Sequence, residues 1–252
     1  MACAIGTGGS RAVDPLTQGL LGGVAAQAVC GRRLPRSAWL IGFVAGTAAD
    51  LDFLIRPASD PLGGLSYHRH FTHALAFIPV GALLSALPFL PWRRLAGRRM
   101  LVLAAALLGY ATHGLLDACT SFGTMLWWPF SRARVSLDII AIIDPVFTLI
   151  LGVGLIWAVL KRRRDLAVAG LGLSLLYLGA GAWQHHRAAM VQRTLAEQRG
   201  HPIARGRVLP TLCNLVVWRS IYEADGRLHL SLIHISEPTR LLSISYAVFC
   251  LK

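Results

Sequence analysis

The chain has 252 residues, of which 55% are hydrophobic and only 15% are charged, with 25 lysines and arginines against 12 acidic residues. Soluble domains usually carry about a quarter charged residues, so this composition excludes most soluble folds and indicates a membrane protein. The formal charge of +13 does not indicate nucleic-acid binding, because the arginines stand in short clusters between apolar runs. Five cysteines, with no pair at CxxC spacing, support neither a zinc finger nor a disulfide framework.

Both ends of the chain differ in composition from its body. Residues 231–252 are rich in Ser and Ile, whereas the body is rich in Ala, Gly, Leu and Arg. We interpret 231–252 as a non-native tail that resembles translated sequencing-adapter DNA; the alternative is a genuine amphipathic tail. Residues 1–13 lack the basic start and apolar core of a signal peptide, and we expect a spurious or disordered leader there. A membrane domain over 14–184 and a C-terminal segment over 185–230 remain.

Six apolar stretches follow one another along the body of the chain. They are residues 16–30, 38–50, 74–91, 100–118, 139–160 and 166–184. Only 139–160 comfortably reaches the ~20 residues that cross a bilayer core upright. The first two stretches are short and rich in Gly and Ala, as in partial or re-entrant spans. We therefore predict an all-α polytopic membrane protein with about six transmembrane or partial spans.

The basic residues between these stretches predict the orientation of the spans. The loops 31–37, 92–99 and 161–165 carry 11 lysines and arginines, whereas the alternate segments carry five. Because cytoplasmic loops are enriched in Lys and Arg, these three loops are expected in the cytoplasm and both termini outside. The sequence thus predicts a multi-pass membrane protein.

This orientation brings most of the scarce acidic residues to one membrane face. Six of the nine aspartates, four histidines and one glutamine fall at the non-cytoplasmic ends of the spans. They are Asp14, Gln18, Asp50, Asp52, His68, His70, His73, His113, Asp117, Asp138 and Asp144. An unpaired Asp near the bilayer centre costs roughly 2.5–3.5 kcal/mol, so these groups must share a hydrated cavity, a counter-ion or a metal on the periplasmic side.

Histidines supply the clearest metal-binding patterns. His113 and Asp117 are four residues apart on an apolar helix, which places both on one face where they can bind one ion; a plain His–Asp hydrogen bond is the structural alternative. His68, His70 and His73 precede an apolar span, and imidazole is a common ligand of zinc, iron or nickel. The alternative for these three is an interfacial loop in which the histidines are merely polar.

Several further polar residues fit a hydrolytic site. Asp50 and Asp52 close the second apolar stretch, where they can serve as metal ligands, as a general base, or simply as solvated acids. Arg69 suits an anionic substrate group or a lipid phosphate. Asp144 precedes Pro145 and is expected to cap or kink its span.

Ordered motifs carry a family resemblance. DPLTQGLLGG, GTAADLD, HRHFTHAL, THGLLDACTSFGTMLWWPFS, IIDPVFTL and RVLPTLCNLVVWRSIYEADGR resemble, in this order, the YdjM-like family of inner-membrane proteins described as metal-dependent hydrolases. The resemblance spans residues 14–230 and implies His and Asp metal ligands at Asp50, Asp52, His68, His73, His113 and Asp117. Gln18 stands where many members have His, which implies a substrate-binding or structural role, and His70 takes the place of a small residue.

The C-terminal segment 185–230 is different in kind. Residues 185–198 predict a polar helix, and CNLVVWRSIYE followed by ADGR and LHL predicts a β-hairpin with an Asp-Gly turn. On the predicted topology, this small α+β segment lies outside the cytoplasm over the proposed site. If the tail is foreign, the sheet is truncated after its turn.

The combined prediction is a membrane-bound metal-dependent hydrolase that acts on an ester, phosphoester or amide. Its expected metal is a divalent ion, zinc first, with ligands among His68, His73, His113, Asp117 and Asp52. Asp50, Asp52 and Arg69 are the expected catalytic residues, and Gln18, His70 and Asp144 are expected to bind substrate or to be structural. The alternatives are a non-catalytic metal-binding membrane protein, a transporter, or a structural adaptor. The expected partners are membrane lipids and a small-molecule or lipid substrate, without nucleic acid.

Overall fold

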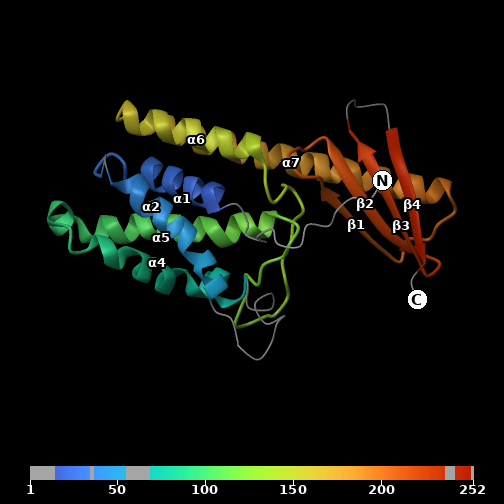
Figure 1. Cartoon of the computed structure of the whole chain (residues 1–252), viewed down its shortest axis with the longest axis horizontal. Helices are drawn as coiled ribbons and strands as arrows, with labels where there is room; N and C mark the ends of the chain where they lie inside the picture. Colours follow the sequence, from blue (N-terminus) through green and yellow to red (C-terminus); the bar gives the residue numbers. More distant parts are fainter. Residues whose placement is uncertain (1–14, 35–36, 55–68, 236–241, 251–252) are drawn as a thin grey trace.

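The computed structural model describes residues 15–34, 37–54, 69–235 and 242–250 (Figure 1). The described residues form six α-helices: α1 (Pro15–Cys30), α2 (Ala38–Ala48), α4 (Ile78–Ala86), α5 (Arg99–Cys119), α6 (Pro145–Leu160) and α7 (Arg164–Gln198). Short 3-10 helices join them: η1 (Ala49–Leu54), η2 (Phe71–His73), η3 (Leu75–Phe77), η4 (Leu87–Phe89) and η5 (Arg93–Arg98). Four strands follow: β1 (Arg205–Pro210), β2 (Val217–Ala224), β3 (Arg227–His234) and β4 (Leu242–Cys250).

The first helices pack against one another through glycines. A side chain at Gly22 of α1 or at Gly109 of α5 would collide with the carbonyl oxygen of Gly42 in α2. Because none of the three carries a side chain, the three backbones approach one another closely, as small residues allow between membrane helices. This close contact helps to bury α1, including its polar residues Gln18 and Gln27, along most of its length.

The predicted apolar stretches all contain helix, but their lengths differ. Two helical runs are long and apolar enough to cross a membrane, namely Arg93–Cys119 and Arg164–Gln198, which contain 18-residue segments with mean hydropathies of 1.5 and 1.6. Leu75–Phe89 and Pro145–Leu160 are shorter apolar helices. The described part of the chain thus contains two candidate spans.

The stretch 139–160, expected to be the most complete span, begins its helix only at Pro145. The Asp144 carboxylate accepts hydrogen bonds from the backbone N–H groups of Val146 and Phe147, at 3.1 and 3.0 Å, and so caps α6. The apolar residue Ile139 lies before this cap, where its backbone N–H donates to the carbonyl of Cys119. The apolar stretch therefore begins before the helix does, so its length in the sequence is greater than the length of α6.

Helix α7 joins two segments that the sequence predicted separately. The apolar stretch 166–184 and the polar helix 185–198 form one continuous helix of 35 residues. The far half of α7 lies along the C-terminal sheet (Figure 1). Ala188 and Val191 of α7 are buried there in one hydrophobic cluster with Trp218. No break separates the apolar half of α7 from the half that supports the sheet.

The sheet is antiparallel in the order β1-β2-β3-β4. Asp225 and Gly226, both with positive φ, form the tight turn between β2 and β3 that the Asp-Gly pair predicts. Strand β1 was not predicted. Strands β3 and β4 extend into residues 231–252, whose composition indicates a non-native tail. The sheet is therefore more extensive than the predicted hairpin.

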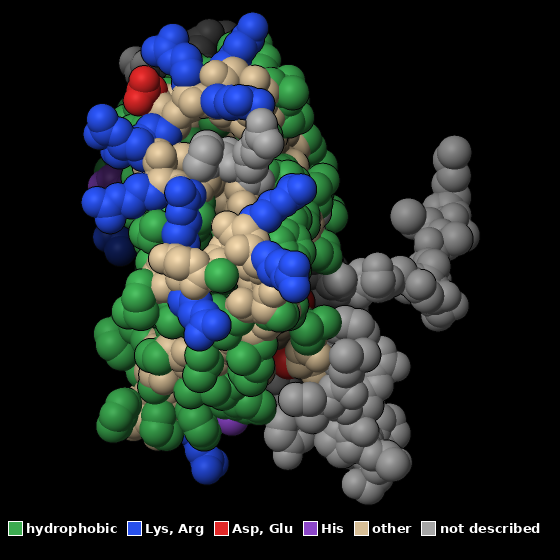
Figure 2. Space-filling model, turned by 90° about the vertical axis from the view of Figure 1, so that its left-hand side faces the viewer, with side chains coloured by type: hydrophobic (Ala, Val, Ile, Leu, Met, Phe, Trp, Pro, Cys, Tyr) green, Lys and Arg blue, Asp and Glu red, His purple; other side chains and the backbone are tan. Residues whose placement is uncertain are grey.

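The three arginine-rich loops lie at one end of the helix bundle, opposite the sheet (Figure 1). Lys and Arg side chains spread over this end of the molecule, as Figure 2 shows. The arrangement agrees with the single-sided placement that the charge distribution predicts.

Candidate metal centre

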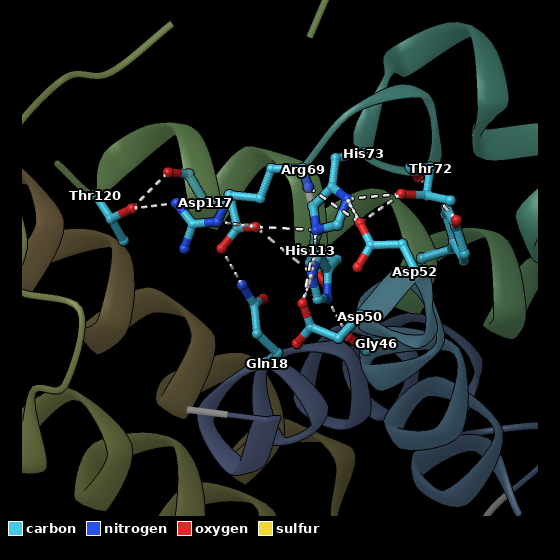
Figure 3. A network of polar contacts seen from close by, with 12 residues as sticks. Gln18, Gly46, Asp50, Asp52, Arg69, Thr72, His73, His113, Asp117 and Thr120 are labelled. Carbon is cyan, nitrogen blue, oxygen red and sulfur yellow. Dashed lines mark hydrogen bonds and ion pairs between the residues drawn. The ribbon is translucent and has the colours of Figure 1, made fainter. Parts of the chain in front are cut away.

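Four predicted polar residues meet between η1, η2 and α5. One ligand atom from each of Asp50, His73, His113 and Asp117 lies within 4.8 Å of the others, so the group can hold a metal ion (Figure 3). His73, His113 and Asp117 have no exposed side-chain surface, and Asp50 retains 14%. His113 and Asp117 are one helical turn apart on α5, while Asp50 follows α2 and His73 belongs to η2. Helix α5 thus supplies two residues of the group, and the turns η1 and η2 supply one each.

The tautomer of His113 follows from its neighbour in α2. Its Nδ1 lies 2.5 Å from the carbonyl oxygen of Gly46, which can only accept, so Nδ1 donates its proton there. A neutral imidazole then has a lone pair on Nε2, the atom that faces the centre. His113 Nε2 lies 3.3 Å from Asp50 Oδ1 and 3.6 Å from Asp117 Oδ2.

His73 is oriented in a similar way by Thr72 and Asp52. The Thr72 hydroxyl donates to Asp52 Oδ2 at 3.1 Å and lies 2.9 Å from His73 Nδ1, from which it can accept. Asp52 Oδ2 is itself 3.5 Å from Nδ1. These contacts favour the proton on Nδ1 and direct the Nε2 lone pair toward the centre.

The two imidazole Nε2 atoms are only 3.0 Å apart. Two lone pairs at this distance repel each other unless a proton or a cation lies between them. The oxygens Asp50 Oδ1, Asp50 Oδ2 and Asp117 Oδ2 are buried and accept no hydrogen bond from any described residue. Two imidazole nitrogens and two carboxylates match the nitrogen and oxygen donors that zinc and related divalent ions use, so the residues present fit such a metal.

Gln18 and Arg69 hold the other side of Asp117. The Gln18 side-chain amide donates to Asp117 Oδ1 at 2.8 Å, and Arg69 Nε lies 3.2 Å from Asp117 Oδ2. The Arg69 guanidinium is fully buried and donates through Nη1 to Thr120 Oγ1 at 3.0 Å. Its Nη2 has no hydrogen-bond partner among the described residues. A buried cation with a spare N–H group thus stands beside the centre.

Glycine and tyrosine in α5 bring the η2 turn close to that helix. A Cβ at Gly114 would lie 2.5 Å from the carbonyl oxygen of His73, so only glycine allows this approach. Tyr110, one turn earlier on α5, donates its hydroxyl to the carbonyl of Thr72 at 2.8 Å. These two contacts fix the His73 turn on the helix that carries His113.

The structure separates Asp50 from Asp52, which the sequence treated as a pair. The 3-10 turn of η1 places Asp50 with the four-residue group, whereas Asp52 contacts His73 on the opposite side of its ring and accepts the backbone N–H of Arg69 at 3.0 Å. Asp52, predicted as a ligand, is therefore placed to orient His73. Thr72 and Thr120 were not singled out, although both adjoin predicted residues in HRHFTH and DACT.

The remaining predicted residues lie away from the centre or outside the described residues. The ring of His70 packs near those of Phe71 and Trp128, and burial, followed by the charges of two arginines, lowers the pKa of His70. Asp144 caps α6 and accepts the Tyr177 hydroxyl. His68 and Asp14 lie outside the described residues.

Asp138 connects the membrane helices to the sheet instead of joining the centre. Arg207 of β1 binds both carboxylate oxygens of Asp138 at 2.8 Å and also donates to Ser121 O and Ser136 Oγ. The hydrogen bonds that Arg207 donates to Asp138 raise the pKa of the Arg207 guanidinium. This ion pair fastens β1 to the loop that follows α5.

The chain belongs to the YdjM inner membrane protein family, whose family model matches residues 13–188. The match covers all four residues of the candidate metal centre and ends within α7, before the sheet. No curated protein and no solved structure matches the chain. The family and its name therefore place the chain among inner membrane proteins.

Proposed function

We propose that this YdjM-family protein is a membrane-bound, metal-dependent hydrolase. His73, His113 and Asp117 are the proposed metal ligands, and Asp50 is a fourth ligand or the general base. The observation that carries the proposal is the pair of Nε2 atoms 3.0 Å apart, both within 3.7 Å of Asp50 Oδ1 and Asp117 Oδ2, two buried carboxylate oxygens that accept no hydrogen bond from a described residue. Zinc is the first candidate, because catalytic zinc sites combine three His and carboxylate ligands with one open position.

The neighbouring residues supply the rest of a hydrolytic site. A bound divalent metal would lower the pKa of water toward neutrality and so supply a nucleophile for an ester, phosphoester or amide. Asp50 Oδ1 lies 3.3 Å from His113 Nε2 and 3.7 Å from His73 Nε2, so this carboxylate is the proposed acceptor of a proton from water at the centre. Asp52 orients His73 through Thr72, and Gln18 orients Asp117.

The spare N–H group of Arg69 supports an anionic substrate. A guanidinium pairs well with phosphate or carboxylate, and here it is fully buried beside Asp117. An acidic ester or a phosphoester is therefore the favoured substrate class within the proposed activity.

The depth of the site along α5 supports access from the periplasmic side. At 1.5 Å rise per residue, His113 and Asp117 lie about 21 and 27 Å from Arg99, which begins the helix at the basic end. A bilayer core is about 30 Å thick, so the proposed site lies in its outer third, away from the basic loops. A topology reporter fused at Arg98 is expected in the cytoplasm; a periplasmic signal would contradict this orientation.

Metal analysis and turnover test the two halves of the proposal. The full chain, purified in detergent, is expected to bind about one divalent ion per chain, and His113→Ala and Asp117→Asn to lose it. His185→Ala, a histidine of α7 outside the group, is the matched control and retains the metal. No stoichiometric metal, or equal content in all variants, would refute the site.

Chromogenic phosphodiester, carboxylic ester and amide substrates then test the activity. We expect turnover of at least one class to be lost with a chelator and with His113→Ala, and restored to the wild type by zinc. Stoichiometric metal without turnover of any class would refute the hydrolase and leave a metal-binding membrane protein.

A further inference from the structure

A polar hollow lies at the basic end of the bundle, far from the candidate metal centre. Its volume is about 640 Å³, and its lining comes from the loop after α1 and the turn between α6 and α7. The lining residues are Gly31, Arg32, Arg162, Arg163, Arg164, Asp165 and Val168. Four arginines from segments about 130 residues apart in the chain therefore share one hollow.

The helices beneath this hollow are packed closely. Ala28 of α1, Ala158 of α6 and Ala167 of α7 are buried against one another, which brings the ends of the three helices together. The turn from α6 to α7 is short, with Arg162 in the left-handed region at φ 53°. The arginines therefore extend from helix ends that are packed tightly against one another.

Most of the positive charge in the hollow is uncompensated. Arg32, Arg162 and Arg164 are exposed and form no ion pair or side-chain hydrogen bond with any described residue. The lining contains one acid, Asp165, and it pairs with Arg163 at 3.5 Å. Three free guanidinium groups remain, and planar guanidinium groups suit the oxygens of a phosphate.

Exposed apolar side chains stand on the same helix ends. Val29 of α1 and Trp157 and Leu160 of α6 are each more than half exposed. Trp is enriched at membrane interfaces, where its ring adjoins both headgroups and acyl chains. A polar phosphate ion would not cover this apolar flank, whereas a lipid would.

We propose that this arginine hollow binds the headgroup phosphate of an anionic phospholipid of the cytoplasmic leaflet, with the acyl chains along Trp157 and Leu160. Basic pockets between membrane helices on the cytoplasmic side suit such headgroups. The site is independent of the proposed hydrolytic centre, which lies toward the other end of α5. Bound lipid would link α1, α6 and α7 at their cytoplasmic ends.

Native mass spectrometry of the full chain in detergent tests the proposal with three probes: dioleoyl phosphatidylglycerol, dioleoyl phosphatidylcholine and inorganic phosphate. We expect phosphatidylglycerol to bind most tightly. The triple variant Arg32→Gln, Arg162→Gln, Arg164→Gln is expected to weaken its affinity roughly 100-fold, since each basic contact near an anionic headgroup strengthens binding about fivefold. Equal binding of phosphatidylcholine, or equally tight binding of phosphate, would overturn the proposal.

A matched triple variant separates the hollow from the general charge of this end. Arg93→Gln, Arg94→Gln and Arg99→Gln remove the same charge from exposed arginines outside the hollow. This control is expected to change phosphatidylglycerol affinity less than about threefold. An equal loss in both triple variants would indicate a non-specific electrostatic effect and refute a built site.

Tryptophan quenching provides a measurement that does not alter the arginines. The vesicles contain phosphatidylglycerol and phosphatidylcholine at equal mole fraction, and the bromine is carried by one lipid or by the other. The fluorescence of Trp157 is the difference between the emission of the wild type and that of Trp157→Phe. We expect this fluorescence to be quenched more strongly when phosphatidylglycerol carries the bromine. Equal quenching by the two brominated lipids would refute selective binding of phosphatidylglycerol next to Trp157.

Discussion

Replacing Gly114 by alanine tests whether the candidate metal centre depends on the close approach of the His73 turn to α5. The new Cβ would lie 2.5 Å from the His73 carbonyl oxygen, whereas ordinary contact begins at 3.4 Å, so the two must separate by about 0.9 Å. Metal sites tolerate errors of roughly 0.2 Å in ligand distance. We therefore expect Gly114→Ala to lower zinc affinity at least about tenfold.

The same substitution is expected to leave the protein folded. Forcing a methyl group into a packed interior costs roughly 1–3 kcal/mol, while the higher helix propensity of alanine returns about 1 kcal/mol. The free energy of unfolding should thus fall by roughly 0–2 kcal/mol. Zinc affinity is measured by chelator competition and stability by thermal unfolding in detergent.

Gly172→Ala in α7 is the matched control. No atom lies within 4 Å of a Cβ built at this position, so alanine is expected to keep zinc affinity and to stabilise the helix slightly. Wild-type zinc affinity in Gly114→Ala would refute the role assigned to the close approach. Loss of zinc in both variants would show that the effect is not local.

Two further substitutions test one contact that supports the candidate metal centre and one that holds the sheet to the loop after α5. Gln18→Leu removes the hydrogen bond to Asp117 Oδ1 and is expected to lower zinc affinity about tenfold in the same competition assay; unchanged affinity would contradict this support. Arg207→Gln breaks the pair with Asp138 and should lower the free energy of unfolding by about 1 kcal/mol, because the pair is partly exposed. Faster hydrogen exchange in residues 121–138 should accompany it, while Arg205→Gln, an exposed neighbour in β1, should leave exchange unchanged. Equal exchange in both arginine variants would show that the pair does not fasten the loop.

Local sequence signals predicted much of the fold. The Asp144-Pro145 pair indicated a cap or kink where α6 begins, and the Asp225-Gly226 pair indicated the turn of the hairpin. Strand β1 carried no such signal, since Arg205–Pro210 is stabilised by pairing with β2 and has little apolar alternation of its own. Its formation depends on contacts distant in the sequence.

The candidate site was predictable from the sequence to the level of residue type and of the helix ends that carry it. The spacing of His113 and Asp117 predicted that they share one helix face, where they can bind one ion or hydrogen-bond to each other. Which of Asp50 and Asp52 faces the centre depends on the 3-10 turn of η1, and no periodicity specifies that turn. The support from Gln18 could not be read from spacing either, because it arises from packing between α1 and α5.

With α7 as one of the candidate spans, its unbroken course would set the distance of the sheet from the bilayer. From Arg164 to Trp183 the helix rises about 29 Å, close to the thickness of a hydrocarbon core, and the remaining 15 residues to Gln198 extend about 22 Å farther. Because α7 is one continuous helix, its apolar half and the half that packs on the sheet are expected to move together as a rigid body. A tilt of α7 in the lipid would rotate the sheet through the same angle. Because helices tilt in response to bilayer thickness, a change in thickness would move the sheet relative to the membrane surface.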